Sequence, residues 1–152
     1  MRVSAKDELI ATYSHDRSVK VWDKTLNKLF TLTGHRRGVW DAAFHSKEAL
    51  LVTAGGDGML KGWSMIDGSC IWSMGEGAGL VRCQWIYEHQ VVTGSVDGIL
   101  KIWDIRKMTS LSYDKHEGKI WALEVRTNEE GKCEIATGAN DSVYQIWAHS
   151  TD

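Results

Sequence analysis

The stretch TAGGDGMLKGWS, residues 53–64, contains the pattern that decides the fold. Its spacing of threonine, aspartate and tryptophan, T-x3-D-x5-W, recurs in TYSHDRSVKVWD (12–23), TGSVDGILKIWD (93–104) and TGANDSVYQIWA (137–148). The tryptophans Trp22, Trp63, Trp103 and Trp147 therefore lie 41, 40 and 44 residues apart. This period is that of a four-stranded propeller blade and is too long for ankyrin, tetratricopeptide or leucine-rich repeats.

Each copy also has the local pattern of a β-hairpin. A β-rich run ends at the threonine, a tight turn contains the aspartate with glycine or serine, and an alternating run leads to the tryptophan. The second repeat predicts strands at 39–44, 49–54, 59–64 and 69–74, and the third at 80–85, 89–95, 99–105 and 109–113. Such short connections favour antiparallel up-and-down pairing, and no helical window is long enough for a crossover. The predicted class is all-β.

At about 40 residues per blade, the chain supplies fewer than four blades. We expect one propeller segment over 1–152, with a partial blade 1–33 and further blades 34–74, 75–114 and 115–152. Met1 aligns with Ala42, and five residues follow Trp147, so the first blade keeps only the end of its inner strand and the last lacks its outer strand. Propellers avoid exposed strand edges by closing the ring. We therefore expect missing sequence or a partner chain to complete it, in preference to a self-closed ring of four blades.

Composition and charge argue against several classes of protein. Lys and Arg number 18 against 20 Asp and Glu, and adjacent basic residues do not exceed pairs such as Arg36-Arg37, so no basic stripe for nucleic acid is visible. No stretch approaches the roughly 18 to 20 apolar residues of a membrane span. The three cysteines are too widely spaced for a CxxC zinc site or a disulfide framework. We predict a soluble protein without metal or cofactor.

The pairs Gly34-His35, Trp22-Asp23 and Trp103-Asp104, together with the threonine, aspartate and tryptophan register, resemble the WD40 family. In that family a buried tetrad links the tryptophan, a threonine or serine, the histidine of the Gly-His pair and the turn aspartate. The resemblance implies these structural residues: Thr12, Asp16 and Trp22; His35, Thr53, Asp57 and Trp63; Thr93, Asp97 and Trp103; and His116, Thr137, Asp141 and Trp147.

The chemistry of these side chains fits a closed network, because an indole only donates, a hydroxyl does both, an imidazole accepts and donates, and a carboxylate accepts. In the third repeat Gly75-Glu76 replaces Gly-His, so we expect water to satisfy that tetrad and the blade to be looser. A His-Asp-Thr set also resembles a hydrolase triad. Because the set recurs along the chain and its hydroxyl faces a tryptophan, we predict no catalytic residue.

WD40 proteins commonly bind partners on the rim where the inner strands begin. The resemblance therefore implies a candidate partner-binding rim of Trp40, Asp41, Arg82 and Trp121, with His15 and Asn140 beside the turn aspartates. Exposed Trp and Arg often carry interface energy. The alternative is that Trp40 and Trp121 pack between neighbouring blades.

Four segments go beyond the general repeat: GHRRGVWDAAF (34–44), SVDGILKIWDI (95–105), KHEGKIWALEV (115–125) and TGANDSVYQIW (137–147). They resemble the C-terminal part of the transducin-β-like WD-repeat subunits of the U3 small nucleolar ribonucleoprotein in the small-subunit processome. The resemblance implies a non-catalytic scaffold in nucleolar pre-ribosomal RNA processing, with other WD-repeat or scaffold proteins as partners, U3-type RNA contacted indirectly, and no membrane. The alternatives are a substrate receptor of a ubiquitin ligase or a signalling adaptor, located in the cytoplasm.

Overall fold

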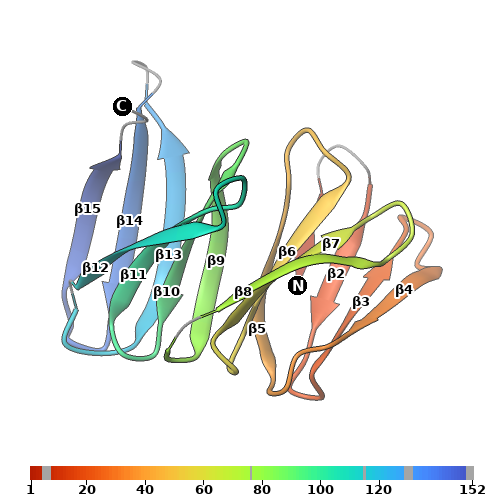
Figure 1. Cartoon of the computed structure of the whole chain (residues 1–152), viewed down its shortest axis with the longest axis horizontal. Helices are drawn as coiled ribbons and strands as arrows, with labels where there is room; N and C mark the ends of the chain where they lie inside the picture. The colour runs from red at the N-terminus through yellow and green to blue at the C-terminus, as the bar shows by residue number, and fades with distance from the viewer. Residues whose placement is uncertain (5–7, 76, 115, 129–131, 150–152) are drawn as a thin grey trace.

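A computed structural model describes residues 1–4, 8–75, 77–114, 116–128 and 132–149. Within these residues the chain is all-β, as predicted: fifteen strands form four antiparallel sheets and no helix is present. There is accordingly no helix in the described ranges that would be long enough to cross a membrane. Figure 1 shows the sheets as blades of an open fan, with the first and last at its two ends.

Strands that follow one another in the chain are neighbours in each sheet. The first blade contains β1 (Arg2–Val3), β2 (Ile10–Tyr13), β3 (Ser18–Trp22) and β4 (Lys28–Thr33). The second contains β5 (Val39–Phe44), β6 (Leu50–Gly55), β7 (Met59–Ser64) and β8 (Cys70–Gly75). The third contains β9 (Leu80–Tyr87), β10 (Gln90–Ser95), β11 (Ile99–Asp104) and β12 (Thr109–Asp114). The fourth contains β13 (Ile120–Thr127), β14 (Cys133–Ala139) and β15 (Tyr144–His149).

The eight strands expected in the second and third repeats are all present, and β5 and β7 have the predicted bounds. The largest difference is β9, which continues two residues beyond the expected end at Trp85. Tyr87 still pairs with Gln90 after a register shift between Gln90 and Val91. The irregular pairing lengthens the strand. A shift of pairing register depends on the partner strand, so the residue types of β9 alone do not predict it.

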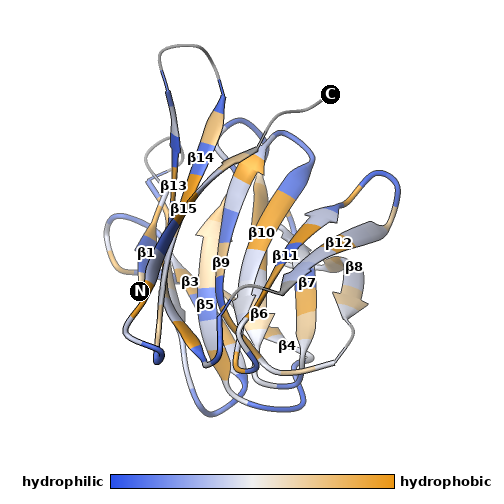
Figure 2. Ribbon diagram, turned by 90° about the vertical axis from the view of Figure 1, so that its left-hand side faces the viewer, coloured by the Kyte–Doolittle hydropathy of each residue, from blue (hydrophilic) through white to orange (hydrophobic). Residues whose placement is uncertain are grey.

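The hydrophobic core lies between the blades. Between the first and second blades, Val19 and Val21 pack in one cluster with Leu51 and Trp63. The next cluster joins Leu60 of the second blade to Trp103 of the third. In the second and third blades the repeat tryptophan therefore packs against the preceding blade. Figure 2 shows the hydrophobic residues on the strands and the hydrophilic ones on many of the connections.

The last blade has one uncovered face within the described residues. Leu60, Leu100 and Tyr144 occupy the same register position in three successive blades, because they pair with Ala54, Gly94 and Gly138. The two leucines are at most 2% exposed, whereas Tyr144 is 81% exposed. The side chain that the next blade covers elsewhere is thus open to solvent here, and the described sheets do not close into a ring.

Two glycines with the same backbone conformation provide a test of how tightly the blades adjoin. Gly98 has φ +83° and an added Cβ would lie 2.1 Å from the backbone oxygen of His116, in the chain leading to the next blade. Gly77 has φ +84° but an added Cβ would meet no atom within 4 Å. We expect Gly77→Ala to lower the free energy of unfolding by about 1 kcal/mol through the positive φ alone. Gly98→Ala should lower it clearly more in equilibrium urea unfolding, and equal losses would contradict the close approach.

Candidate functional site

A hydrogen-bonded chain of four side chains crosses the second blade from the core to the turn. The indole N–H of Trp63 donates to the Thr53 hydroxyl oxygen over 2.9 Å, and that oxygen lies 2.8 Å from Nε2 of His35. Nδ1 of His35 lies 3.0 Å from a carboxylate oxygen of Asp57. The Asp57 carboxylate can only accept, so Nδ1 of His35 carries a proton. In a neutral imidazole Nε2 then has no proton and accepts the hydrogen bond of the Thr53 hydroxyl.

The surroundings keep His35 neutral. Its side chain is 1% exposed, and this burial lowers its pKa below the ordinary value of 6.5 despite the opposing effect of Asp57. Burial raises the pKa of Asp57, but the backbone N–H of Arg36 at 2.7 Å and the hydrogen bond from His35 outweigh it and leave that pKa lowered. The pair is thus an anionic carboxylate that accepts from a neutral imidazole.

The fourth blade has the same arrangement. Nδ1 of His116 lies 2.9 Å from Asp141, and its Nε2 lies 2.8 Å from the Thr137 hydroxyl. The indole N–H of Trp147 reaches Thr137 over a longer 3.4 Å. The backbone N–H of Glu117 donates to Asp141, as that of Arg36 does to Asp57 in the second blade. In both blades the aspartate therefore fixes the segment that enters the inner strand.

The first and third blades keep the tryptophan–threonine bond but use a different partner for the aspartate. Trp22 donates to Thr12 over 3.0 Å, and Trp103 to Thr93 over 2.8 Å. The aspartates of these blades, Asp16 and Asp97, are exposed, unlike Asp57 and Asp141. Glu76, which stands at the histidine position of the third repeat, lies outside the described residues.

In the third blade a serine is the hydrogen-bond partner of the aspartate, whereas the sequence led us to expect water there. The buried Ser95 hydroxyl donates to the Asp97 carboxylate, and its oxygen accepts the backbone N–H of Ile99 over 3.0 Å. The sequence contains a signal for this: the residue two positions after the threonine is Ser95 in the third repeat, and Gly55 or Ala139 in the repeats with histidine. In the first repeat this residue is Ser14, but the Asp16 carboxylate accepts from Ser18. A small side chain leaves space for the imidazole, because a Cβ on Gly55 would lie 2.3 Å from Nδ1 of His35.

The candidate rim is shaped by a β-bulge at the start of three inner strands. In β5 the pairing passes from Val39–Gly55 to Asp41–Ala54 and leaves Trp40 without a partner. The same shift leaves Val81 unpaired in β9 and Trp121 unpaired in β13. A bulge changes the direction of the side chain that it carries. At the bulges of β5 and β13, Trp40 and Trp121 are 40% and 44% exposed, whereas Val81 at the bulge of β9 is buried.

One lysine connects the two exposed rings. The ammonium group of Lys119 lies 4.8 Å from the ring centre of Trp40 and 3.6 Å from that of Trp121. The indole N–H of Trp121 donates to the side-chain oxygen of Asn140 over 2.6 Å. The rings of His15 and Trp40 meet edge-on, with 6.4 Å between their centres. Tryptophans from the second and fourth blades thus flank a single cation. We call Trp40, Lys119 and Trp121 the tryptophan rim.

The other predicted rim residues lie differently. Arg82 is half-buried, and its guanidinium donates to the backbone oxygen of Val81 over 3.1 Å. Asp41 does not lie on the rim: it is 1% exposed and its two carboxylate oxygens accept from Arg2 over 3.1 and 2.9 Å. It also accepts the backbone N–H of Cys83. The bulge at Trp40 turns Asp41 inward, where it links three blades.

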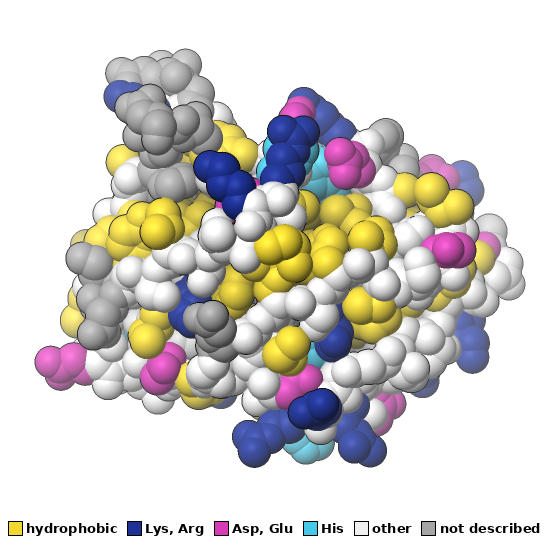
Figure 3. All heavy atoms as spheres, in the orientation of Figure 1, with side chains coloured by type: hydrophobic (Ala, Val, Ile, Leu, Met, Phe, Trp, Pro, Cys, Tyr) yellow, Lys and Arg dark blue, Asp and Glu magenta, His cyan; other side chains and the backbone are white. Residues whose placement is uncertain are grey.

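Three arginines gather beside Trp40. Arg17 from the β2–β3 turn and Arg36 and Arg37 from the β4–β5 connection line a hollow of about 520 Å³ together with Trp40. Among the described residues, none of these guanidinium groups is ion-paired with a carboxylate. Figure 3 shows Lys, Arg and His side chains clustered at the lower edge, where these turns lie in Figure 1. We refer to Arg17, Arg36 and Arg37 as the arginine cluster.

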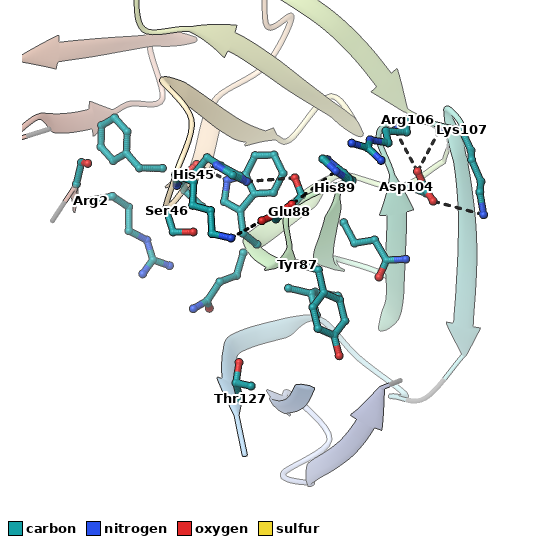
Figure 4. Close-up of a pocket in the computed structure, with 18 of the residues that line it drawn as sticks. Arg2, His45, Ser46, Tyr87, Glu88, His89, Asp104, Arg106, Lys107 and Thr127 are labelled. Atoms are coloured by element: carbon teal, nitrogen blue, oxygen red, sulfur yellow. Dashed lines mark hydrogen bonds and ion pairs between the residues drawn. The ribbon is translucent and has the colours of Figure 1, made fainter. Parts of the chain in front are cut away.

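A larger hollow of about 1080 Å³ lies at the other ends of the inner strands (Figure 4). His45 is buried beside it, and both of its ring nitrogens are hydrogen-bonded. Its Nδ1 accepts the N–H groups of Lys47 and Glu48, and its Nε2 donates to the Glu88 backbone oxygen. Lys47 also pairs with the Glu88 carboxylate. These contacts join the second blade to the third, and the described residues contain no cluster of three potential metal ligands.

Comparison with known proteins gives consistent matches. The profile of the WD domain, G-beta repeat family matches residues 1–23, 26–64 and 68–104. Pre-mRNA-processing factor 19 from Oryza sativa subsp. japonica is 28% identical over 93% of this chain and 28% of its own length. Ribosome biogenesis protein WDR12 homolog from Ixodes scapularis is 28% identical over 92% of this chain and 34% of its own length.

A solved structure of U3-55K has a TM-score of 0.87 at 22% identity, covering 96% of this chain and 44% of that one. At this identity the likeness shows the fold alone. The chain spans about a third or less of the two curated relatives and under half of this structure.

The His35 network leads to a prediction about pH. At neutral pH we expect His35→Ala to lower the free energy of unfolding by roughly 1 to 3 kcal/mol, because it leaves Thr53 and Asp57 without their partner. The lowered pKa of His35 means that below its ordinary value of 6.5 the unfolded chain binds a proton that the folded chain does not. Wild-type stability should therefore fall as pH decreases through this value, and the gap to the variant should narrow.

Urea unfolding of both proteins between about pH 7.5 and 5 measures this gap. The exposed His15→Ala variant serves as the control and should differ from wild type by less than about 0.5 kcal/mol. A gap that stays constant or widens towards low pH would contradict a neutral, buried His35.

Proposed function

Because the chain belongs to the WD40 family, whose profile matches more than half of it, we propose that it is a non-catalytic scaffold subunit that binds macromolecular partners through the tryptophan rim. The observation that carries the proposal is the pair of exposed tryptophans, Trp40 and Trp121. Tryptophan is among the side chains that most often dominate binding energy at interfaces. Both rings stand on strands, so little conformational freedom is lost when a partner covers them.

The networks below the rim support its rigidity. Gly38 and Lys119 each precede an inner strand, and their backbone oxygens accept N–H groups of Gly56 at 2.8 Å and Asn140 at 3.1 Å. Asp57 and Asp141 hold the same two entering segments through the backbone N–H groups of Arg36 and Glu117. The buried tetrads thereby fix the loops that carry the exposed side chains.

The same burial argues against catalysis by the His-Asp-Thr sets. Thr53 is 0% exposed and the His35 side chain is 1% exposed, so a substrate has no access to either group. The Thr53 hydroxyl is also occupied by the indole N–H of Trp63. A nucleophile needs an open approach for the reacting atom.

We propose further that the assembly is a ribonucleoprotein, namely the nucleolar small-subunit processome acting on pre-ribosomal RNA. Support comes from the four segments that resemble its WD-repeat subunits, and from a relative named as a ribosome biogenesis protein. A second relative is named as a pre-mRNA-processing factor, and the fold is that of U3-55K. Other WD-repeat or scaffold proteins are the expected partners.

Affinity isolation of the tagged chain from nuclear extract tests this function. We expect pre-ribosomal assembly proteins and U3-type small nucleolar RNA to be recovered, and the Trp40→Ala/Trp121→Ala double variant to reduce recovery at least about fivefold by removing the rim anchors. Ile66→Ala, which truncates a side chain that is 84% exposed away from the rim, is the matched control and should recover the same partners as wild type. Recovery of a cullin complex or a Gγ-like subunit in their place would refute the proposal.

A further inference from the structure

We propose that the rim binds single-stranded RNA directly, with bases stacked on Trp40 and Trp121 and phosphates beside the arginine cluster. The inference rests on the proposed function and deepens it by naming the partner class for the same surface. The sequence shows no basic stripe for nucleic acid, and its resemblance to the processome subunits implies only an indirect contact with RNA. The fold brings basic residues together.

The charge of the surface suits a polyanion. Arg17 is separated by 19 residues from Arg36 in the chain, yet both line one hollow with Arg37. No acidic side chain of the described residues lines that hollow. The neighbouring turn aspartate Asp16 faces its own turn, where one carboxylate oxygen accepts the N–H and O–H of Ser18. Three guanidinium groups are therefore available to phosphates, which they bind well.

The aromatic groups continue the same surface. Trp40 lines the hollow of the arginine cluster, and Lys119 connects Trp40 to Trp121. Gly56 lets Trp40 lie close over the β6–β7 turn, because a Cβ there would approach its indole nitrogen to 2.8 Å. Arginines, a first ring, a cation and a second ring thus follow one another along one rim. Aromatic rings beside a positive groove are the recurring means of binding unpaired bases.

The arrangement favours an unpaired strand over other anions. Bases in a duplex are stacked on each other and present only their edges, so a tryptophan ring has no free base face to contact. An acidic or phosphorylated peptide matches the charge of the arginine cluster but does not carry a flat ring on every residue. Single-stranded RNA provides phosphates and free base faces along one chain, and stacking tolerates any base.

The test is fluorescence anisotropy of a 5′-labelled oligouridylate of about 12 nucleotides titrated with the purified chain. We expect saturable binding that weakens as salt rises from about 50 to 200 mM. Trp40→Ala/Trp121→Ala should raise Kd at least about tenfold. Arg36→Ala/Arg37→Ala should also raise Kd and should flatten the dependence of log Kd on log salt by about 0.7 for each phosphate that the protein no longer neutralises.

Matched control variants distinguish the effect of the rim residues from the effect of removing any exposed cation or any exposed aromatic ring. Arg106→Ala/Lys107→Ala removes two exposed cations at the opposite end of the inner strands, and Tyr144→Ala removes an exposed ring on the last blade. Both should leave Kd within about twofold of wild type, and Trp40→Phe should retain most of the binding because it keeps a stacking face. Circular dichroism and thermal unfolding confirm that each variant is folded.

The proposal is overturned if the oligouridylate does not bind, if the rim variants bind like wild type, or if a phosphorylated acidic peptide binds while the RNA does not. These results are separable from the scaffold function. If the chain recovers pre-ribosomal proteins from extract but does not bind RNA when purified, only the inference of direct RNA binding is refuted. If it binds RNA when purified but recovers none of those proteins, the proposed assembly is refuted.

Discussion

The bond between the repeat tryptophan and its threonine is the interaction on which the rest of the structure depends. It occurs in all four hairpins, with lengths of 3.0, 2.9, 2.8 and 3.4 Å. The indole can donate only one hydrogen bond, so this contact fixes the orientation of the ring while its faces remain free for apolar packing. Trp63 and Trp103 then fill the clusters that join each blade to the preceding one. A local bond within one hairpin thereby sets the contact between blades.

Histidine extends this bond from the core to the surface. In the second blade the donors run from Trp63 through Thr53 and His35 to Asp57, and Asp57 finally accepts the N–H of Arg36. The buried polar network thus reaches from the core to the segment beneath the exposed rim. A fully satisfied network is stiff, whereas a single missing member leaves several buried groups unpaired. The segments that carry the rim are consequently held by buried groups.

The candidate site was only partly predictable from the sequence. Trp40 and Trp121 are recognisable as rim residues, and the structure places both at the surface beside Lys119. Asp41, their neighbour in the same stretch, is buried against Arg2, because an unpaired bulge residue shifts the alternation of inward and outward side chains. The arginine cluster is not predictable in this way, since Arg17 and Arg36 belong to different blades.

The sequence by itself determined the all-β class, the hairpin turns and the tryptophan–threonine–aspartate register, because each depends on residues only a few positions apart in one hairpin. It also contained, in Ser95 against Gly55, the difference between serine and histidine as the partner of the aspartate in the third and second blades. The tertiary structure alone decided which side chains the bulges expose, that Asp41 joins three blades, and that cations from separate turns meet beside Trp40. These features arise where blades adjoin. Contacts between blades depend on the packing of residues that are far apart in the sequence, and a local sequence pattern contains no information about them.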